Sequence, residues 1–278
     1  MSIFKKVHNH GIVGSVFFMY RLSESIVRRL FGIDRVSELT KIRSCLASDI
    51  SVRLDFTVRY GRYQGMKLLH TLWCNLDRPA IFLGTYELEI VDLIYEFSLA
   101  GREFFVDIGA AEGYHALGVL KNNSYKTSVA FEMDERSRNL LFKNAVENGV
   151  QDRLTIKGYA HSDILQELEC DLSKTVFLID IEGGEFDLLT AELFMEMRSA
   201  ILIVELHEWV PSVPDAFDTL IGNSASTHSI SLIDQAQRRF PDFQEFHNLP
   251  DDLRLLSMSE GRPCSMRWAV FEPNLSQV

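Results

Sequence analysis

The segment between residues 103 and 114 constrains the fold most, because an apolar run there ends in an acid and a loop with two glycines follows. The run predicts a buried strand that ends near Asp107, with a helix beginning directly after the loop. Gly109 and Gly113 predict a tight turn, since glycine adopts positive φ and allows a ligand to approach closely. The first N–H groups of the new helix would face a bound anion or carboxylate. A nicotinamide dinucleotide fingerprint needs glycine where Asp107 stands, so this loop favours a cationic amino-acid moiety over a diphosphate.

From this segment onward, strand-like apolar runs alternate with helical patterns. Most of the first five runs are nearly continuous in apolar residues, as expected when helices cover both faces of a sheet. The alternation predicts an α/β fold with a doubly wound, mostly parallel seven-stranded sheet, preceded by an N-terminal helical and β-hairpin extension. The expected strands are 104–108, 128–132, 154–157, 176–181, 201–206, 228–233 and 266–271, and the expected helices are 114–120, 135–148, 164–168, 185–197, 216–221 and about 235–240.

The beginning of the chain differs in charge from the remainder. Residues 1–67 contain 12 Lys/Arg and 5 Asp/Glu, whereas the rest contains 16 and 34. We therefore expect a basic extension over 1–60 and a domain over 61–278, with its core from about 101. The patterns predict helix within 1–50, a hairpin-like β unit from 51–60 and 66–73, and an amphipathic helix over 87–100.

Composition narrows the possible partners and the compartment. An acidic body does not suit the phosphates of a nucleic acid, so no nucleic-acid partner is expected. The basic residues within 1–50 could contact an anionic membrane surface or an acidic protein, although a solvated helical face explains them more simply than either. The apolar run 11–20 is about half the length needed to span a bilayer. The four cysteines stand far apart without a C-x-x-C pair, so we expect reduced thiols, no zinc site and a cytoplasmic protein, peripheral at most to the inner membrane surface. The sequence indicates no oligomeric state.

Acidic residues follow four of the predicted strands, at the edge where an open α/β sheet binds its ligand. Because these strand ends should converge in space, the acids predict one site. They are Asp107, Glu132, Asp180 with Glu182, and Glu205, which is followed by His207.

Glu132 stands about 25 residues after Asp107, close to the spacing of a ribose-binding acid. A carboxylate there can accept strong hydrogen bonds from two ribose hydroxyls. The alternative is a helix N-cap, a role that Asp134 fits better.

Two segments carry a resemblance to known enzymes. Asp107-Ile-Gly-Ala-Ala-Glu-Gly113 resembles motif I of the class I S-adenosylmethionine-dependent methyltransferases, and Asp180-Ile-Glu-Gly-Gly-Glu185 resembles the signature of the FkbM-type family among them. Segments 84–89, 203–207, 255–263 and 267–270 are also similar, so the resemblance covers roughly 80–272. It implies S-adenosylmethionine as cofactor, the usual reversed last strand, and O-methylation of a hydroxyl on a glycan or small metabolite in polysaccharide or natural-product biosynthesis.

The resemblance also assigns expected roles to residues. Many methyltransferases place an acid for the adenine amino group near Tyr159, where this chain lacks one, so Tyr159 or Asp163 would serve instead. The expected cofactor-binding residues are Glu87, Asp107, Gly109, Ala110, Gly113, Tyr114, Glu132, Met133, Tyr159, Ala160 and Asp180.

For catalysis, an alcohol needs a base near neutrality, and histidine commonly supplies it. His207 is the first candidate and Asp180 the second, with Glu182 and Glu205 orienting the base or the acceptor. A loop histidine without a catalytic role is the alternative for His207. Glu185 and Arg262 are candidate acceptor contacts, although a plain surface position also suits Arg262.

Other functions remain open at this stage. Paired acids could hold a divalent cation, but no tight acid–acid–Asn cluster favours it, so a metal is an open alternative that is not favoured. A second hypothesis is a non-catalytic scaffold that keeps the fold. A protein or nucleic-acid methyltransferase is disfavoured by the acidic body and by the absence of an Asn/Asp-Pro-Pro-Tyr-like sequence after the fourth strand, and a nicotinamide-dependent enzyme is the weakest candidate.

Overall fold

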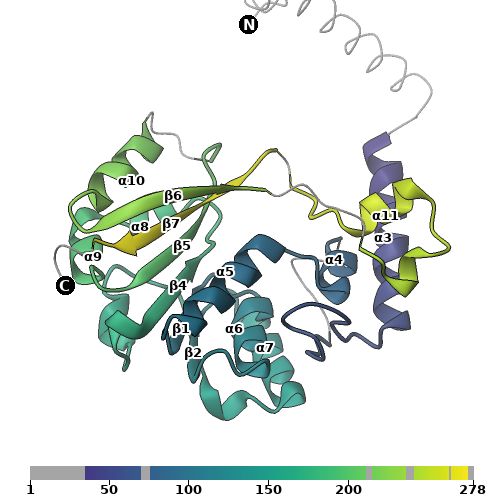
Figure 1. The fold of residues 1–278 in the computed structure, drawn as a ribbon, viewed down its shortest axis with the longest axis horizontal. Coiled ribbons are helices and arrows are strands. Elements are labelled where there is room, and N and C mark those ends of the chain that lie inside the picture. Colours follow the sequence, from purple (N-terminus) through teal and green to yellow (C-terminus); the bar gives the residue numbers. More distant parts are fainter. Residues whose placement is uncertain (1–34, 70–75, 211–214, 236–240, 263, 275–278) are drawn as a thin grey trace, which may run out of the picture. The chain divides into compact units, whose positions relative to one another are not determined.

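The computed structural model describes residues 35–69, 76–210, 215–235, 241–262 and 264–274 (Figure 1). The chain separates into two compact units, Met1–Cys45 and Leu46–Val278. The helix expected before residue 35, the helix expected at 236–240 and the end of the expected hairpin at 70–73 lie outside the described residues. Among the described helices, none combines the length and the apolar character that a membrane crossing requires.

The second unit is built on one seven-stranded sheet with the order β3-β2-β1-β4-β5-β7-β6. Strands β1 to β5 are parallel, whereas β7 runs antiparallel to both β5 and β6. The predicted fold class, including the reversed ending, is therefore confirmed. The strands are β1 (Phe104–Ile108), β2 (Thr127–Phe131), β3 (Leu154–Lys157), β4 (Thr175–Ile179), β5 (Ile201–Leu206), β6 (His228–Asp234) and β7 (Arg267–Pro273).

Two hydrophobic cores lie on opposite faces of this sheet, because successive side chains of a strand point to opposite sides. In β4, Val176 and Leu178 belong to one core, whereas Phe177 and Ile179 belong to the other. Figure 1 shows one group of helices on each face. The first core is covered by α5 (Leu88–Leu99), α6 (Tyr114–Lys121) and α7 (Glu135–Asn148), and the second by α8 (Glu185–Leu188), α9 (Ala191–Glu196) and α10 (Ala216–Ser224).

The predicted β hairpin is mostly wrong. Helix α3 (Arg35–Arg53) continues into the expected strand, and Asp55 and Phe56 adopt positive φ just after it. Among the residues of the expected hairpin that the structure describes, a single antiparallel bridge joins Thr57 to Lys67. The alternating apolar pattern was ambiguous there, since a short apolar run fits a helix end as well as a strand.

Helix α4 (Arg78–Leu83) was not predicted, although it carries the usual signals. Pro79 stands in its first turn, and Gly84 ends it in a left-handed conformation with φ of 71°. The chain then continues to Glu87, the residue directly before α5.

The expected long helix over 185–197 is divided into α8 and α9. Thr190 begins the second helix by accepting a hydrogen bond from the backbone N–H of Leu193 at 3.3 Å.

The expected helix at 164–168 is a 3₁₀ turn, and a further helix forms in the region before β7. The remaining elements are η1 (Gln151–Arg153), η2 (Ile164–Glu167), η3 (Leu172–Lys174), η4 (Gln244–Phe246) and α11 (Asp251–Ser257).

Candidate active site

The loop between β1 and α6 has the predicted positive φ at both glycines, 94° at Gly109 and 95° at Gly113. A Cβ atom on Gly109 would lie 1.8 Å from the carbonyl oxygen of Asp180, and one on Gly113 would lie 2.1 Å from Cδ1 of Leu141. At both positions a side chain would collide with another part of the same protein, so close packing favours glycine there. The close approach at Gly109 joins the first loop to the end of β4, which fixes the two strand ends that bear acids.

Replacing Gly109 with alanine is expected to reduce the free energy of unfolding by about 3 kcal/mol or more, because backbone contact and positive φ both oppose the new side chain. Gly149→Ala is the matched control, since Gly149 has φ of 67° but no atom within 4 Å of the added Cβ. That variant should lose only about 1 kcal/mol. Urea denaturation of both variants measures the difference, and equal losses would show that the contact with Asp180 does not matter.

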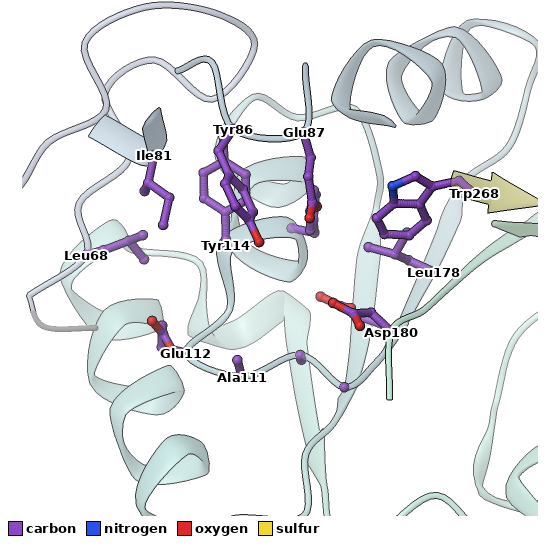
Figure 2. Close-up of a pocket in the computed structure, with 14 residues that line it drawn as sticks. Leu68, Ile81, Tyr86, Glu87, Ala111, Glu112, Tyr114, Leu178, Asp180 and Trp268 are labelled. Atoms are coloured by element: carbon purple, nitrogen blue, oxygen red, sulfur yellow. The ribbon is translucent and has the colours of Figure 1, made fainter. Parts of the chain in front are cut away.

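A pocket lies beside this loop at the carboxyl ends of β1 and β4 (Figure 2). Its apolar wall is formed by Leu68, Ile81, Tyr86, Tyr114, Leu178 and Trp268. Four acids also line it, namely Glu87, Asp107, Glu112 and Asp180. The only basic side chain in the described lining is His115, which pairs with Glu87. Such a pocket favours a cationic ligand with an apolar part and disfavours a diphosphate.

Two of these acids change their charge near neutral pH. Asp107 is 3% exposed and accepts a hydrogen bond from the backbone N–H of Ala116 at 3.0 Å. Burial raises the pKa of Asp107 to about 7, although the charge of His115 opposes this shift. Burial and the nearby charge of Glu87 raise the pKa of Asp180 to about 7. A bound cation would favour the ionised form of both carboxyls.

Glu87 faces the pocket from above in Figure 2 and is held in place by three neighbours. Its Oε2 lies 2.8 Å from Nε2 of His115, its Oε1 accepts from Arg262 at 3.0 Å, and its N–H donates to Glu260 at 2.9 Å. Burial alone would raise the pKa of Glu87, but His115 and Arg262 outweigh it and lower this pKa. Burial alone would lower the pKa of His115, but Glu87 raises it. Glu87 and His115 therefore form an ion pair at the pocket wall.

Arg262 is buried among carboxylates, so a plain surface position is excluded. Its guanidinium contacts Glu87 and Glu260 at 3.0 Å and also binds Glu205. Its side chain is 11% exposed. These contacts hold the end of β5, the start of α5 and the loop before β7 together, and they leave Arg262 engaged by the protein's own acids rather than presented to an acceptor.

His207 lies directly after β5, among acids from the end of β4, from the start of α8 and from β5 itself. Its Nδ1 is 3.2 Å from Oε1 of Glu185, and its backbone N–H donates to the same oxygen at 2.9 Å. Its Nε2 faces Asp180 at 3.6 Å, Glu182 at 3.4 Å and Glu205 at 3.7 Å. Burial lowers the pKa of His207, but the hydrogen bond to Glu185 and the surrounding charges outweigh it and raise this pKa. The structure thus brings together all four residues expected to carry catalysis.

Glu185 is completely buried and does not face the pocket. One of its oxygens contacts His207, and the other accepts from the backbone N–H of Gly183 at 2.9 Å. An acceptor cannot reach this carboxylate. Its position beneath the imidazole instead suits a group that orients His207.

Asp180, Glu205 and His207 each offer one ligand atom, and these atoms lie within 4.8 Å of one another. This spacing is compatible with a shared divalent cation. However, Arg262 already gives Glu205 a positive partner, and Glu185 holds the other nitrogen of His207. The cluster is therefore compensated by the protein's own side chains, and its geometry does not require a metal.

The expected ribose and adenine contacts lie at the ends of β2 and β3, outside the lining of the pocket. Glu132 accepts from the backbone N–H of Ala111 at 2.8 Å and of Asp134 at 2.7 Å, so its carboxylate also supports the glycine loop. Asp134 accepts from Ser137 at 3.1 Å and caps α7. The residues that follow the two strands are accessible, with Met133 72% and Tyr159 59% exposed, and Ala160 partly buried.

Several residues of this site were not predicted from the sequence. Tyr86 and Glu112 stand beside predicted site residues, so their positions alone could have suggested them. Glu260 and Trp268 stand in the segments 255–263 and 267–270 that carry the resemblance, but no local pattern indicated that they reach the site, because their contacts join positions far apart in sequence.

No protein-family model and no curated protein matches this chain. Solved structures with partial similarity include the M1A22 tRNA methyltransferase of B. subtilis, at 9% identity and TM-score 0.42, over 66% of this chain and 64% of that one. An O-methyltransferase from Bacillus cereus in complex with SAH aligns at 13% identity and TM-score 0.41, over 65% and 81%. A putative O-methyltransferase from Klebsiella pneumoniae aligns at 10% identity and TM-score 0.42, over 91% and 96%. Identities this low leave the function of this chain to be inferred from its own residues.

Proposed function

We propose that this chain is an S-adenosylmethionine-dependent O-methyltransferase. The observation that supports this most directly is the position of Asp180, which lines the acidic pocket and also lies 3.6 Å from Nε2 of His207. A site for a cation thus adjoins a candidate general base. Methyl transfer from a sulfonium to a hydroxyl needs these two features side by side.

The pocket residues fit the proposed cofactor. Glu87, Asp107 and Asp180 would hold its cationic ammonium and sulfonium groups, and the apolar wall would cover its uncharged part. Glu132 would bind the ribose hydroxyls, as predicted, with Met133, Tyr159 and Ala160 near the adenine. When bound, the cofactor supplies an activated methyl group, whereas the protein positions the acceptor and removes its proton.

His207 is the proposed base. An Nδ1–H donated to Glu185 leaves Nε2 with the lone pair, and Nε2 is the nitrogen that faces the acid cluster. Glu205 is fixed by Arg262 close to this nitrogen, and Glu182, with a side chain 87% exposed, can accept a hydrogen bond from the acceptor. Asp180 is the second candidate for the base.

The class of acceptor, the compartment and the independence from metal are also part of this proposal. The FkbM-type signature at 180–185 supports a hydroxyl of a glycan or small metabolite as acceptor, and the excess of acids after residue 67 disfavours a nucleic acid. We propose a cytoplasmic enzyme of polysaccharide or natural-product biosynthesis that works without a divalent cation. The basic residues within 1–50 would provide a contact for a membrane surface or a protein partner.

Calorimetry with S-adenosylhomocysteine and, separately, with NAD tests the cofactor. We expect the first to bind and the second not to bind, and the opposite result would exclude a methyltransferase. Radiolabelled methyl donor with a panel of sugars, lipid-linked glycans and small alcohols, with and without a chelator, then tests transfer and metal independence. Binding of S-adenosylhomocysteine without transfer to any acceptor, glycan, protein or nucleic acid would support a scaffold instead.

Glu132→Ala is expected to weaken binding of S-adenosylhomocysteine at least tenfold, since it removes the carboxyl group that would accept the ribose hydrogen bonds. Because Glu132 also supports the glycine loop, calorimetry should be accompanied by a thermal denaturation curve. Glu132→Gln is the control of equal size, which keeps a carbonyl oxygen but loses the charge. Unchanged affinity in the alanine variant would remove the ribose role.

A further inference from the structure

Trp209 is a large, accessible aromatic side chain directly beside the proposed base. Its ring centre lies 5.3 Å from that of His207, with the ring planes inclined at 60°. It is 45% exposed, and the next residue, Val210, is 48% exposed. Trp268, by contrast, is 2% exposed. Single exposed apolar residues are common, but this pair lies next to the only described histidine that faces the acid cluster at the ends of β4 and β5.

The turn that carries Trp209 is held by contacts on both sides. Glu208 binds Arg267 through two hydrogen bonds of 3.0 and 2.6 Å, and the backbone N–H of Val210 donates to the carbonyl of His207 at 2.9 Å. Val210 also packs against Gly183, where an added Cβ would lie 2.5 Å from its Cγ1. The indole is thus presented on a fixed turn, so little conformational entropy would be lost when a ligand covers it.

The charges near Trp209 restrict what can lie against it. Glu182 and Asp180 both face His207, and Glu182 projects into solvent. These carboxylates would repel a phosphate or carboxylate on the acceptor and would accept hydrogen bonds from its hydroxyl groups. The negative face of the indole attracts C–H or cationic groups, and a flat or cyclic molecule can cover much of such a face.

We infer that Trp209 and Val210 form the acceptor-binding surface, and that the acceptor is a ring compound without an anionic group, whose face stacks on the indole while its hydroxyl points to His207. This inference rests on the proposed methyltransferase function and adds the shape and charge of the acceptor. Trp209 acts on the acceptor alone, because it does not line the pocket assigned to the cofactor.

Methyl-transfer kinetics of the full chain with Trp209→Ala test this surface. The acceptors are two uncharged rings, a methyl glycoside and a simple phenol, together with glycerol as an acyclic alcohol and a nucleoside 5′-monophosphate as an anionic one. We expect at least one ring to be the best acceptor, and its KM to rise at least tenfold in the variant, equivalent to about 1.4 kcal/mol. The kcat and the Kd for S-adenosylhomocysteine should stay within twofold, and Trp209→Phe should recover most of the lost affinity.

Phe142→Ala is the matched control, since Phe142 is an aromatic residue on α7 that is 55% exposed and does not line the pocket. Its kinetics should equal those of the natural chain. An unchanged KM in Trp209→Ala, or a preference for glycerol or the nucleotide, would overturn the inference while leaving methyl transfer intact. Binding of S-adenosylhomocysteine without transfer to any of the four acceptors would overturn the inference. The panel of sugars, lipid-linked glycans and small alcohols described above then decides whether the proposed methyltransferase activity also fails.

Discussion

Replacing His207 with alanine is expected to lower kcat about 10²- to 10⁴-fold, the usual contribution of a general base. The Kd for S-adenosylhomocysteine should change little, because His207 does not line the pocket assigned to the cofactor. Single-turnover kinetics with radiolabelled methyl donor, combined with calorimetry, separate the two effects. Substantial remaining activity would indicate that Asp180, the second candidate, is the base.

The pH dependence of the same reaction should reveal the residue that orients the base. A base must be unprotonated, so kcat should rise with pH as His207 loses its proton, and the midpoint should lie above the ordinary histidine pKa because that pKa is raised. Glu185→Gln keeps a hydrogen-bond acceptor of equal size but removes the charge that contributes to this shift. The acidic limb of the profile should therefore move to lower pH in that variant. A lower kcat with an unmoved limb would indicate that Glu185 serves only packing.

The sequence predicted the sheet well because its central strands are buried on both faces and are therefore almost uninterrupted apolar runs. β4 and β5 are buried at every position. The acids at their ends were also predictable, since the ends of parallel strands meet at one edge of a sheet. The break between α8 and α9 was less evident, because Thr190 stands inside an apolar pattern that could continue as one helix.

The contacts that organise the site could not be predicted in the same way. Glu260 and Arg262 bind Glu87 across more than 170 positions of sequence, and no local pattern marks such a pair. Glu185 was expected to face an acceptor because of its place in a signature. The close turn at Gly183 and Gly184 instead directs it beneath His207, where burial and two hydrogen-bonded contacts decide its role.

The affinity for the cofactor is expected to depend strongly on pH. Asp107 and Asp180 have pKa values raised to about 7, so both are largely uncharged at pH 6 and ionised at pH 8. A sulfonium stabilises the ionised forms, and binding then releases protons. The charged and titratable groups around these carboxyls are Glu87, His115, Glu182, His207 and Arg262. Burial and these neighbours together give the raised pKa values of Asp107 and Asp180.

A carboxyl with a pKa of about 7 is ionised in about ten times more of the molecules at pH 8 than at pH 6. If the ligand binds only to the ionised form, its affinity therefore rises about tenfold over this interval. We therefore expect the Kd for S-adenosylmethionine to fall by about tenfold or more over this interval in calorimetric titrations. S-adenosylhomocysteine, which lacks the sulfonium charge, should show a clearly smaller change. Asp107→Asn and Asp180→Asn each remove one titrating group at nearly constant size, so each should flatten the curve for the charged cofactor. Parallel curves for the two ligands would show that these acids do not face the sulfonium, because only the sulfonium charge distinguishes the ligands electrostatically.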